Sequence, residues 1–136
     1  MDIPGTTPSR VLIVEDDPIS RRILAASIAP LGVEVTECAS VEEAWDHLYR
    51  RPPDVVITDL MMPGAVDGQG LLKAARAMRP DVEVVLMTAF ATIETAVAAM
   101  RDGAYDFITK PLKRHSLVRA VEKAMEKQAL RSEEHT

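Results

Sequence analysis

The sequence predicts an α/β domain in which five parallel strands alternate with five helices, as a doubly wound sheet of strand order 2-1-3-4-5. Two observations predict this class. Five short apolar runs alternate with segments of helical periodicity, as parallel strands joined by right-handed helical crossovers require. Several of the runs end in an acidic residue, a threonine or a lysine, and open α/β sheets carry their sites at the carboxyl ends of their strands. In this order the first and third strands lie side by side.

The composition is that of one globular domain. The 136 residues are 47% hydrophobic and 27% charged, which is sufficient for a single core. The net charge of -5 argues against nucleic-acid binding by this segment, because attraction to phosphates needs a basic face. The sequence has no membrane-spanning run, no signal peptide and no Cys/His cluster, and its single Cys38 is expected to be a small buried residue. We therefore expect a cytoplasmic protein without a membrane partner.

The first part of the chain supplies the first two strands. Residues 1–9 have little to bury and predict a disordered lead-in, after which Arg10 to Val14 forms the first strand. Asp17 can cap the helix that follows, and Gly32 ends it. The run from Val33 to Glu37 predicts the second strand.

The central strand follows a capped helix. Ser40, with Glu43 three residues on, makes a capping box at the start of that helix. Trp45 lies among apolar residues at helical spacing, which favours packing over a role as a ligand platform. The run from Val55 to Asp59 is continuously apolar, ends in a carboxylate and is followed by a break at Pro63-Gly64, as in a buried parallel strand.

The second half repeats the alternation. A glycine-rich turn and a third helix lead to a fourth strand from Val82 to Thr88, and Tyr105 to Thr109 predicts the fifth. The helix between these strands carries an apolar stripe closed by Gly103. The stripe consists of Ile93, Ala96, Val97 and Met100. The last helix ends the domain near residue 128, and residues 129–136 predict a frayed tail or the start of a linker.

In this topology Glu15, Asp16 and Asp59 converge at one edge of the sheet. Two like charges about 4 Å apart repel by about 4 kcal/mol at an effective dielectric near 20, so positive charge is required. An all-oxygen site suits Mg²⁺ or Mn²⁺, and Lys110 follows the fifth strand as a second positive group.

An anion carried by Asp59 would meet a metal ion, the ammonium of Lys110, the hydroxyl of Thr88 and the backbone N–H of Ala89. These are the groups that stabilise a transferring phosphoryl group, and they predict that Asp59 is the nucleophile that becomes an aspartyl phosphate. A solvated loop position is the simpler interpretation of any single acid at a strand end. Acids, a hydroxyl and a lysine at four strand ends favour the site instead.

Four segments at predicted strand ends carry a family resemblance. They are Val14-Glu15-Asp16-Asp17, Asp59-Leu60-Met61-Met62-Pro63-Gly64, Met87-Thr88-Ala89-Phe90 and Phe107-Ile108-Thr109-Lys110-Pro111. Together they resemble the receiver domain of bacterial two-component response regulators, over residues 10–127. The resemblance implies a flavodoxin-like fold and a signalling phosphoacceptor rather than an enzyme acting on a separate substrate.

The resemblance also implies roles for single residues. Asp59 would accept phosphate from the phosphohistidine of a sensor histidine kinase or phosphotransfer protein. Mg²⁺ would be held by Glu15, Asp16, Asp59 and the backbone carbonyl of Met61. Glu15 stands where aspartate is more frequent, and its extra methylene bears on how directly it reaches the metal.

The remaining implied roles concern phosphate binding and switching. Lys110 would bind the phosphate and precede a cis bond to Pro111, while Thr88, with the backbone of Ala89, would also bind the phosphate. Thr88 would move toward the phosphate, and Phe107 would turn inward behind it. Plain core packing is an equal interpretation of Phe107, because a phenylalanine has no hydroxyl to drive the change.

Two local features distinguish this chain. Two residues, Ala65-Val66, stand where the family usually has one between Pro-Gly and Asp-Gly, which predicts a longer turn after the site. Met61 and Phe90, two residues beyond Asp59 and Thr88 respectively, cannot hydrogen-bond a hydrolytic water. We therefore predict slow self-hydrolysis of the aspartyl phosphate, over many minutes or longer.

Residues 90–97 and 103–107 most resemble receivers of sigma-54-dependent transcription activators. The fourth helix, fifth strand and fifth helix would then form a face for homodimerisation or for an output domain in a longer parent chain. One alternative is a stand-alone phosphoryl shuttle, and another is a docking module that is not phosphorylated. A Mg²⁺-dependent aspartyl phosphohydrolase is disfavoured, because it requires a second acid at position 61.

Overall fold

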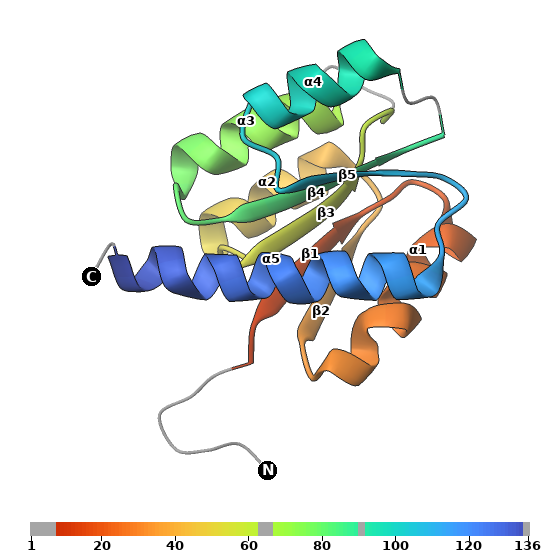
Figure 1. Cartoon of the computed structure of the whole chain (residues 1–136). Helices are drawn as coiled ribbons and strands as arrows, with labels where there is room; N and C mark the ends of the chain where they lie inside the picture. The colour runs from red at the N-terminus through yellow and green to blue at the C-terminus, as the bar shows by residue number, and fades with distance from the viewer. Residues whose placement is uncertain (1–7, 63–66, 90–91, 135–136) are drawn as a thin grey trace.

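The computed structural model describes residues 8–62, 67–89 and 92–134. The strands form one parallel sheet of order β2-β1-β3-β4-β5, so the predicted fold class and strand order are confirmed (Figure 1). The strands are β1 (Arg10–Val14), β2 (Glu34–Cys38), β3 (Val55–Asp59), β4 (Glu83–Thr88) and β5 (Asp106–Thr109). The helices are α1 (Pro18–Ile28), the short 3-10 helix η1 (Ala29–Leu31), α2 (Val41–Arg50), α3 (Gly68–Met78), α4 (Ile93–Arg101) and α5 (Arg114–Glu134).

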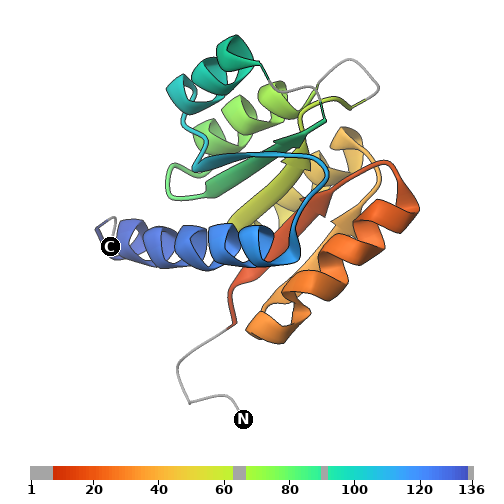
Figure 2. The same ribbon diagram turned by 45° about the vertical axis from the view of Figure 1, so that its right-hand side comes forward.

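Helices cover both faces of the sheet (Figure 2). Side chains alternate across each strand, so Val11 and Ile13 pack with α1 and α5, whereas Leu12 and Val14 pack with the helices of the opposite face. The opposite face is covered by α2, α3 and α4. Burial of the sheet on both faces explains why β1, β3 and β4 read as continuous apolar runs.

The strand register brings the predicted site to one edge. Val14 lies opposite Thr58 in the β1–β3 pair, and Asp59 lies opposite Met87 in the β3–β4 pair. Thr88 lies opposite Thr109 at the end of the β4–β5 pair. At this edge of the sheet, the carboxyl ends of four strands therefore lie close together, those of β1, β3, β4 and β5.

Local signals place the helix starts as predicted. Asp17 accepts a hydrogen bond from the backbone N–H of Ser20 at 2.8 Å, and the hydroxyl of Ser40 accepts from the N–H of Glu43 at 3.2 Å. Gly32 ends η1 with a φ of 74°, the left-handed conformation that favours glycine. Three strands begin one residue later than predicted, at Glu34, Glu83 and Asp106.

The apolar stripe of α4 does not pack on the sheet. Ile93 is 83% exposed, Val97 50% and Met100 49%, and the only buried residue of the helix is Ala99. The helix begins with a capping box between Thr92 and Thr95. An amphipathic helix that turns its larger apolar side chains outward is available for contact with a partner.

Helix α5 continues through Glu134, into the segment predicted as a frayed tail or linker. A helix that runs on does not show where the folded unit ends, so the boundary at residue 128 stays a prediction. Of the predicted lead-in, residues 1–7 lie outside the described residues.

Two side chains pack as predicted from the sequence. Cys38 is fully buried at the end of β2, and burial raises the pKa of its thiol to about 12, so it is protonated at neutral pH. Trp45 is half-buried against the core, in agreement with a packing role. Within the described part of the chain, none of the helices has both the length and the apolar character needed to cross a bilayer.

Candidate functional site

Lys110 joins two acids at the carboxyl edge of the sheet. Its Nζ lies 2.5 Å from Oδ2 of Asp59 and 3.0 Å from Oε2 of Glu15. Glu15 is only 1% exposed and Asp59 7% exposed, whereas the side chain of Lys110 is 26% exposed. Two largely buried carboxylates therefore share one ammonium at the protein surface.

Backbone hydrogen bonds from adjacent strands fix these three residues. Glu15 follows β1, and its N–H donates to the carbonyl of Cys38 at 3.0 Å. Asp59 is the last residue of β3 and is paired with β4 in the sheet. The N–H of Lys110 donates to the carbonyl of Thr88 at 2.8 Å, and the Lys110-Pro111 peptide bond is cis. The site is thus built on the ends of the strands, which are rigid.

Burial and the contacts of Lys110 with both acids determine the electrostatics of the site. Burial disfavours the charged form of Lys110, but hydrogen bonds to Asp59 and Glu15 outweigh it and raise the pKa of the ammonium above its usual value. Burial raises the pKa of Glu15, and the hydrogen bond from Lys110 opposes that change only in part. Lys110 is therefore charged at neutral pH and offsets the repulsion between the acids.

The loop after β3 turns back onto Asp59. The backbone N–H of Met61 donates to Oδ1 of Asp59 at 3.0 Å, so each carboxylate oxygen has one donor. The Met61 side chain itself is 62% exposed. The carboxylate is held in orientation and remains next to solvent, as a group that reacts with an external partner requires.

Asp16 does not join the pair. It is exposed, and no group of three His, Cys, Asp or Glu side chains in the described ranges is spaced to hold a metal ion. Lys110 supplies positive charge to the two buried acids, whereas Asp16 is exposed to solvent. The donor types still suit Mg²⁺, because carboxylates and a backbone carbonyl are the hard oxygen ligands that it prefers.

The other predicted residues lie around this edge. Thr88 is fully buried at the end of β4, and Ala89 follows it at an exposed position. Phe107 is half-buried on β5 and packs against the core, and its role as a switch stays a prediction. Phe90 and the Ala65-Val66 insertion lie outside the described residues.

Sequence reasoning missed the role of Gly68, the first residue of α3. A Cβ added to Gly68 would lie 2.3 Å from the carbonyl oxygen of Asp59 and 2.8 Å from Cα of Leu60. The N–H of Gly68 donates to the carbonyl of Leu60 at 3.1 Å. Helix α3 can approach the backbone of the site only because residue 68 has no side chain. The Asp67-Gly68 pair after the central strand was the available signal.

Gly68→Ala is expected to lower the free energy of unfolding by about 1–3 kcal/mol, because the overlap with the Asp59 backbone forces a shift of the main chain. Gly70→Ala, in the same helical turn, is the matched control and is expected to be neutral or stabilising, because alanine favours a helix over glycine. Urea unfolding followed by circular dichroism measures both variants. Equal stability of Gly68→Ala and the wild type would contradict the close approach.

A groove of about 300 Å³ opens beside Lys110, between α1 and the start of α5. Its lining includes Glu15 and Lys110 from the acidic pocket, together with Ile23, Leu24 and Leu117. Ile23 is 61% exposed, and Ile19 on the same helix is 70% exposed. An exposed apolar edge therefore borders the charged pocket.

The chain is similar to a known protein family over most of its length. The model of the response regulator receiver domain matches residues 11–122. The regulatory protein AtoC of Escherichia coli is 40% identical over 129 residues, which cover 94% of this chain and 28% of AtoC. The DNA-binding transcriptional regulator NtrC of Escherichia coli is 35% identical over 115 residues, which cover 85% of this chain and 24% of NtrC. The chain thus spans about a quarter of the length of these relatives.

Solved structures agree with the fold. NtrX from Brucella abortus, crystallised in complex with ATP, superposes with a TM-score of 0.85 at 33% identity, over 93% of this chain and 29% of that one. A putative response regulator from Chloroflexus aurantiacus superposes with a TM-score of 0.81 at 32% identity, over 88% of this chain and 99% of that one.

Proposed function

The chain belongs to the response regulator receiver family, and from that premise we propose that it accepts a phosphoryl group on Asp59 from a sensor histidine kinase or phosphotransfer protein. The observation that carries this proposal is the contact of Asp59 and the buried Glu15 with one ammonium, that of Lys110. The setting of the reaction would be the cytoplasm. The domain acts as a signalling phosphoacceptor and not as an enzyme with a separate substrate.

The chemistry follows from the geometry of Asp59. A carboxylate oxygen attacks the phosphorus of phosphohistidine, the phosphorus–nitrogen bond breaks, and an acyl phosphate forms on the side chain. The hydrogen bond from the Met61 N–H orients the carboxylate for this attack. The ammonium of Lys110 then moves its contact from the Asp59 carboxylate oxygen to the phosphoryl oxygens and offsets their negative charge.

Glu15, Asp16, Asp59 and the backbone carbonyl of Met61 would hold Mg²⁺, or Mn²⁺ in its place. When bound, the ion supplies positive charge to the transferred phosphoryl oxygens. Asp16 is the exposed member of this set and Glu15 the buried one. Both follow β1 directly, so they lie at the same edge of the sheet as Asp59.

The protein donor would reach Asp59 beside the groove between α1 and α5. A phosphohistidine must approach within bonding distance of the carboxylate, so its carrier has to rest on the surfaces that border the pocket. The exposed Ile19 and Ile23 provide apolar contact area at that border. This border, where acidic and apolar side chains of the domain lie next to each other, suits a helix of the donor protein that presents its histidine on an amphipathic face.

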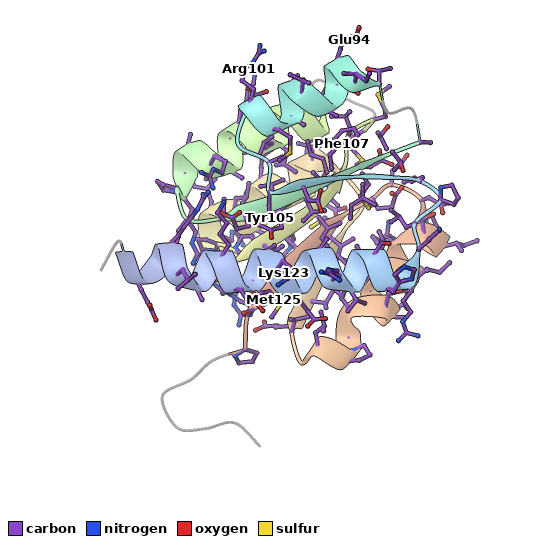
Figure 3. The ribbon with its side chains drawn as sticks, viewed as in Figure 1. Glu94, Arg101, Tyr105, Phe107, Lys123 and Met125 are labelled. Atoms are coloured by element: carbon purple, nitrogen blue, oxygen red, sulfur yellow. The ribbon has the colours of Figure 1, made fainter. Side chains whose placement is uncertain are left out.

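The output face would be formed by α4, β5 and α5 (Figure 3). Thr88 and Phe107 link this face to the pocket, since Thr88 ends β4 and Phe107 lies on the neighbouring strand. When a phosphate binds to Thr88 and to the Ala89 N–H, the Thr88 hydroxyl would move toward it. Phe107 would then have space to turn further inward.

Homodimerisation is the proposed use of the output face. The exposed stripe of Ile93, Val97 and Met100 supplies apolar area, and Glu94 and Arg101 on the same helix supply charges of both signs (Figure 3). A two-fold interface pairs the same patch on both copies, which such a mixed patch permits. An output domain of a longer parent chain is the other partner, and the names of the relatives favour a transcriptional output, of the sigma-54-dependent type that the sequence resembles.

The test is incubation of the purified chain with acetyl phosphate, with Mg²⁺ or with EDTA, followed by intact-mass measurement. One phosphoryl adduct that depends on Mg²⁺ is expected. Absence of any adduct under both conditions would leave the docking-module interpretation. An adduct that turns over rapidly with release of phosphate would favour a phosphohydrolase, which the methionine at position 61 argues against.

The phosphoprotein is expected to lose its phosphate slowly, over many minutes or longer. Met61 lies two residues after Asp59 and is exposed, and its thioether has no hydrogen-bond donor and only a weak acceptor with which to orient an attacking water. Met61→Asn introduces both capacities and is expected to accelerate the loss. The decay of the adduct in intact-mass spectra after removal of acetyl phosphate measures both rates. A half-life of seconds in the wild type would contradict the prediction.

A further inference from the structure

A second buried charge cluster lies at the opposite end of the sheet. Glu83 is the first residue of β4 and is only 1% exposed. Its Oε1 lies 2.9 Å from Nη1 of Arg131 and 3.4 Å from Nη1 of Arg76. Its Oε2 is buried and has no hydrogen-bond partner in the described part of the chain. One inaccessible carboxylate therefore serves two guanidinium groups.

The two arginines come from different helices. Arg76, in the last turn of α3, also donates to the carbonyl of Val82 at 2.7 Å, which fixes it beside β4. Arg131 lies in the last turn of α5. Burial, followed by the positive charge of Arg131, lowers the pKa of Arg76, as expected for two cations that share one anion.

After Met125, which packs against the core, the described apolar residues of α5, Ala129 and Leu130, are exposed. The last apolar side chain of α5 that is fully buried is that of Ala124, and Leu130 is 61% exposed. Gln128 is buried, and its amide donates to Asp81 at 3.3 Å. After residue 128, Arg131 makes the ion pair with Glu83, and its Nη1 also lies 3.5 Å from the carbonyl oxygen of Pro80, just before the strand. A helix end without apolar contacts frays unless polar contacts hold it.

We propose that Glu83 and Arg131 form an ionic latch that holds the last two turns of α5 against the sheet. The latch sets the direction in which the helix leaves the domain, and Arg76 orients the carboxylate from the other side. The device belongs to the fold itself and does not depend on phosphorylation of Asp59. Loss of the ion pair is expected to loosen the helix from residue 129 onward while the core stays folded.

Hydrogen exchange of the full chain tests the latch, with mass spectrometry of the peptide that covers residues 126–134. Arg131→Gln is expected to accelerate exchange of this peptide roughly tenfold or more, because the contact to a buried carboxylate is lost. Glu83→Gln is expected to have the same effect. In the double variant the acceleration is expected to equal that of Arg131→Gln alone, because both changes remove one interaction.

Two controls separate the latch from general loosening. Arg119→Gln changes an exposed arginine of α5 outside this peptide and is expected to leave the exchange unchanged. Arg76→Gln removes the competing guanidinium, so the exchange of residues 126–134 is expected to stay at the wild-type rate or fall. Unchanged exchange in Arg131→Gln would overturn the latch, and so would equal acceleration by Arg76→Gln and Arg131→Gln or additive effects in the double variant. Arg131→Gln alone decides the outcome if Glu83→Gln fails to fold.

Discussion

Asp59→Asn is expected to abolish the phosphoryl adduct formed with acetyl phosphate and Mg²⁺, because an amide oxygen is not a nucleophile of comparable strength. The substitution keeps the shape of the side chain and a carbonyl oxygen that can accept from the Met61 N–H. The contact between Lys110 and Glu15 also remains. The loss of phosphorylation is therefore expected without loss of the fold.

Asp54→Asn is the matched control. Asp54 precedes the same strand at its other end, where it accepts hydrogen bonds from Arg79 and from the backbone N–H of Arg10. Its substitution is expected to leave the adduct unchanged. Intact-mass measurement of both variants, with circular dichroism to verify folding, provides the comparison. An adduct of equal yield on Asp59→Asn would place the acceptor at another residue.

Lys110→Met is expected to slow adduct formation by roughly 100-fold or more, because the charge of the phosphoryl oxygens loses its fixed ammonium. The variant is also expected to unfold more easily, by about 1–3 kcal/mol at neutral pH, since Glu15 and Asp59 would face each other without a cation. The side chain of Lys110 is about a quarter exposed, so the expected loss of stability is smaller than that for breaking a fully buried ion pair. Lys113→Met, an exposed neighbour, is the control and is expected to change neither property.

The loss of stability caused by Lys110→Met is expected to depend on pH. The pKa of Lys110 is raised in the folded protein, so its contribution is complete below the unfolded value of about 10.4 and is lost as the pH rises through the folded value. The contribution also shrinks in acid, because burial raises the pKa of Glu15 and the protonated carboxyl needs no cation. Urea unfolding at neutral pH, in acid and above pH 10 measures this. A deficit that does not change with pH would contradict the shared ion pair.

The central strands were predictable because β1, β3 and β4 are buried on both faces and each ends at, or is followed by, a polar group. Val55 to Asp59 shows both properties, and the structure places β3 at the centre as predicted. The helix starts at Asp17 and Ser40 were predictable for a local reason, since each cap bonds an N–H only three residues away.

What the sequence could not show depends on tertiary contacts. Periodicity finds the stripe of Ile93, Val97 and Met100 but does not say whether it faces the sheet or solvent. The sequence also does not show that Asp16 is exposed while its neighbour Glu15 is buried. The burial of Glu83 at the start of β4 depends on Arg76 and Arg131, which reach it from two different helices.

The direction of α5 has a practical consequence for experiments. The helix begins near Lys110 and ends beside Glu83, so its two ends lie at opposite edges of a sheet whose strands span roughly 15–20 Å. A phosphodonor at the carboxyl edge and a group joined to the end of α5 would therefore not collide. A fluorophore or fusion partner attached after α5 can report on the domain while the kinase is bound, and any influence of one on the other has to pass through the sheet.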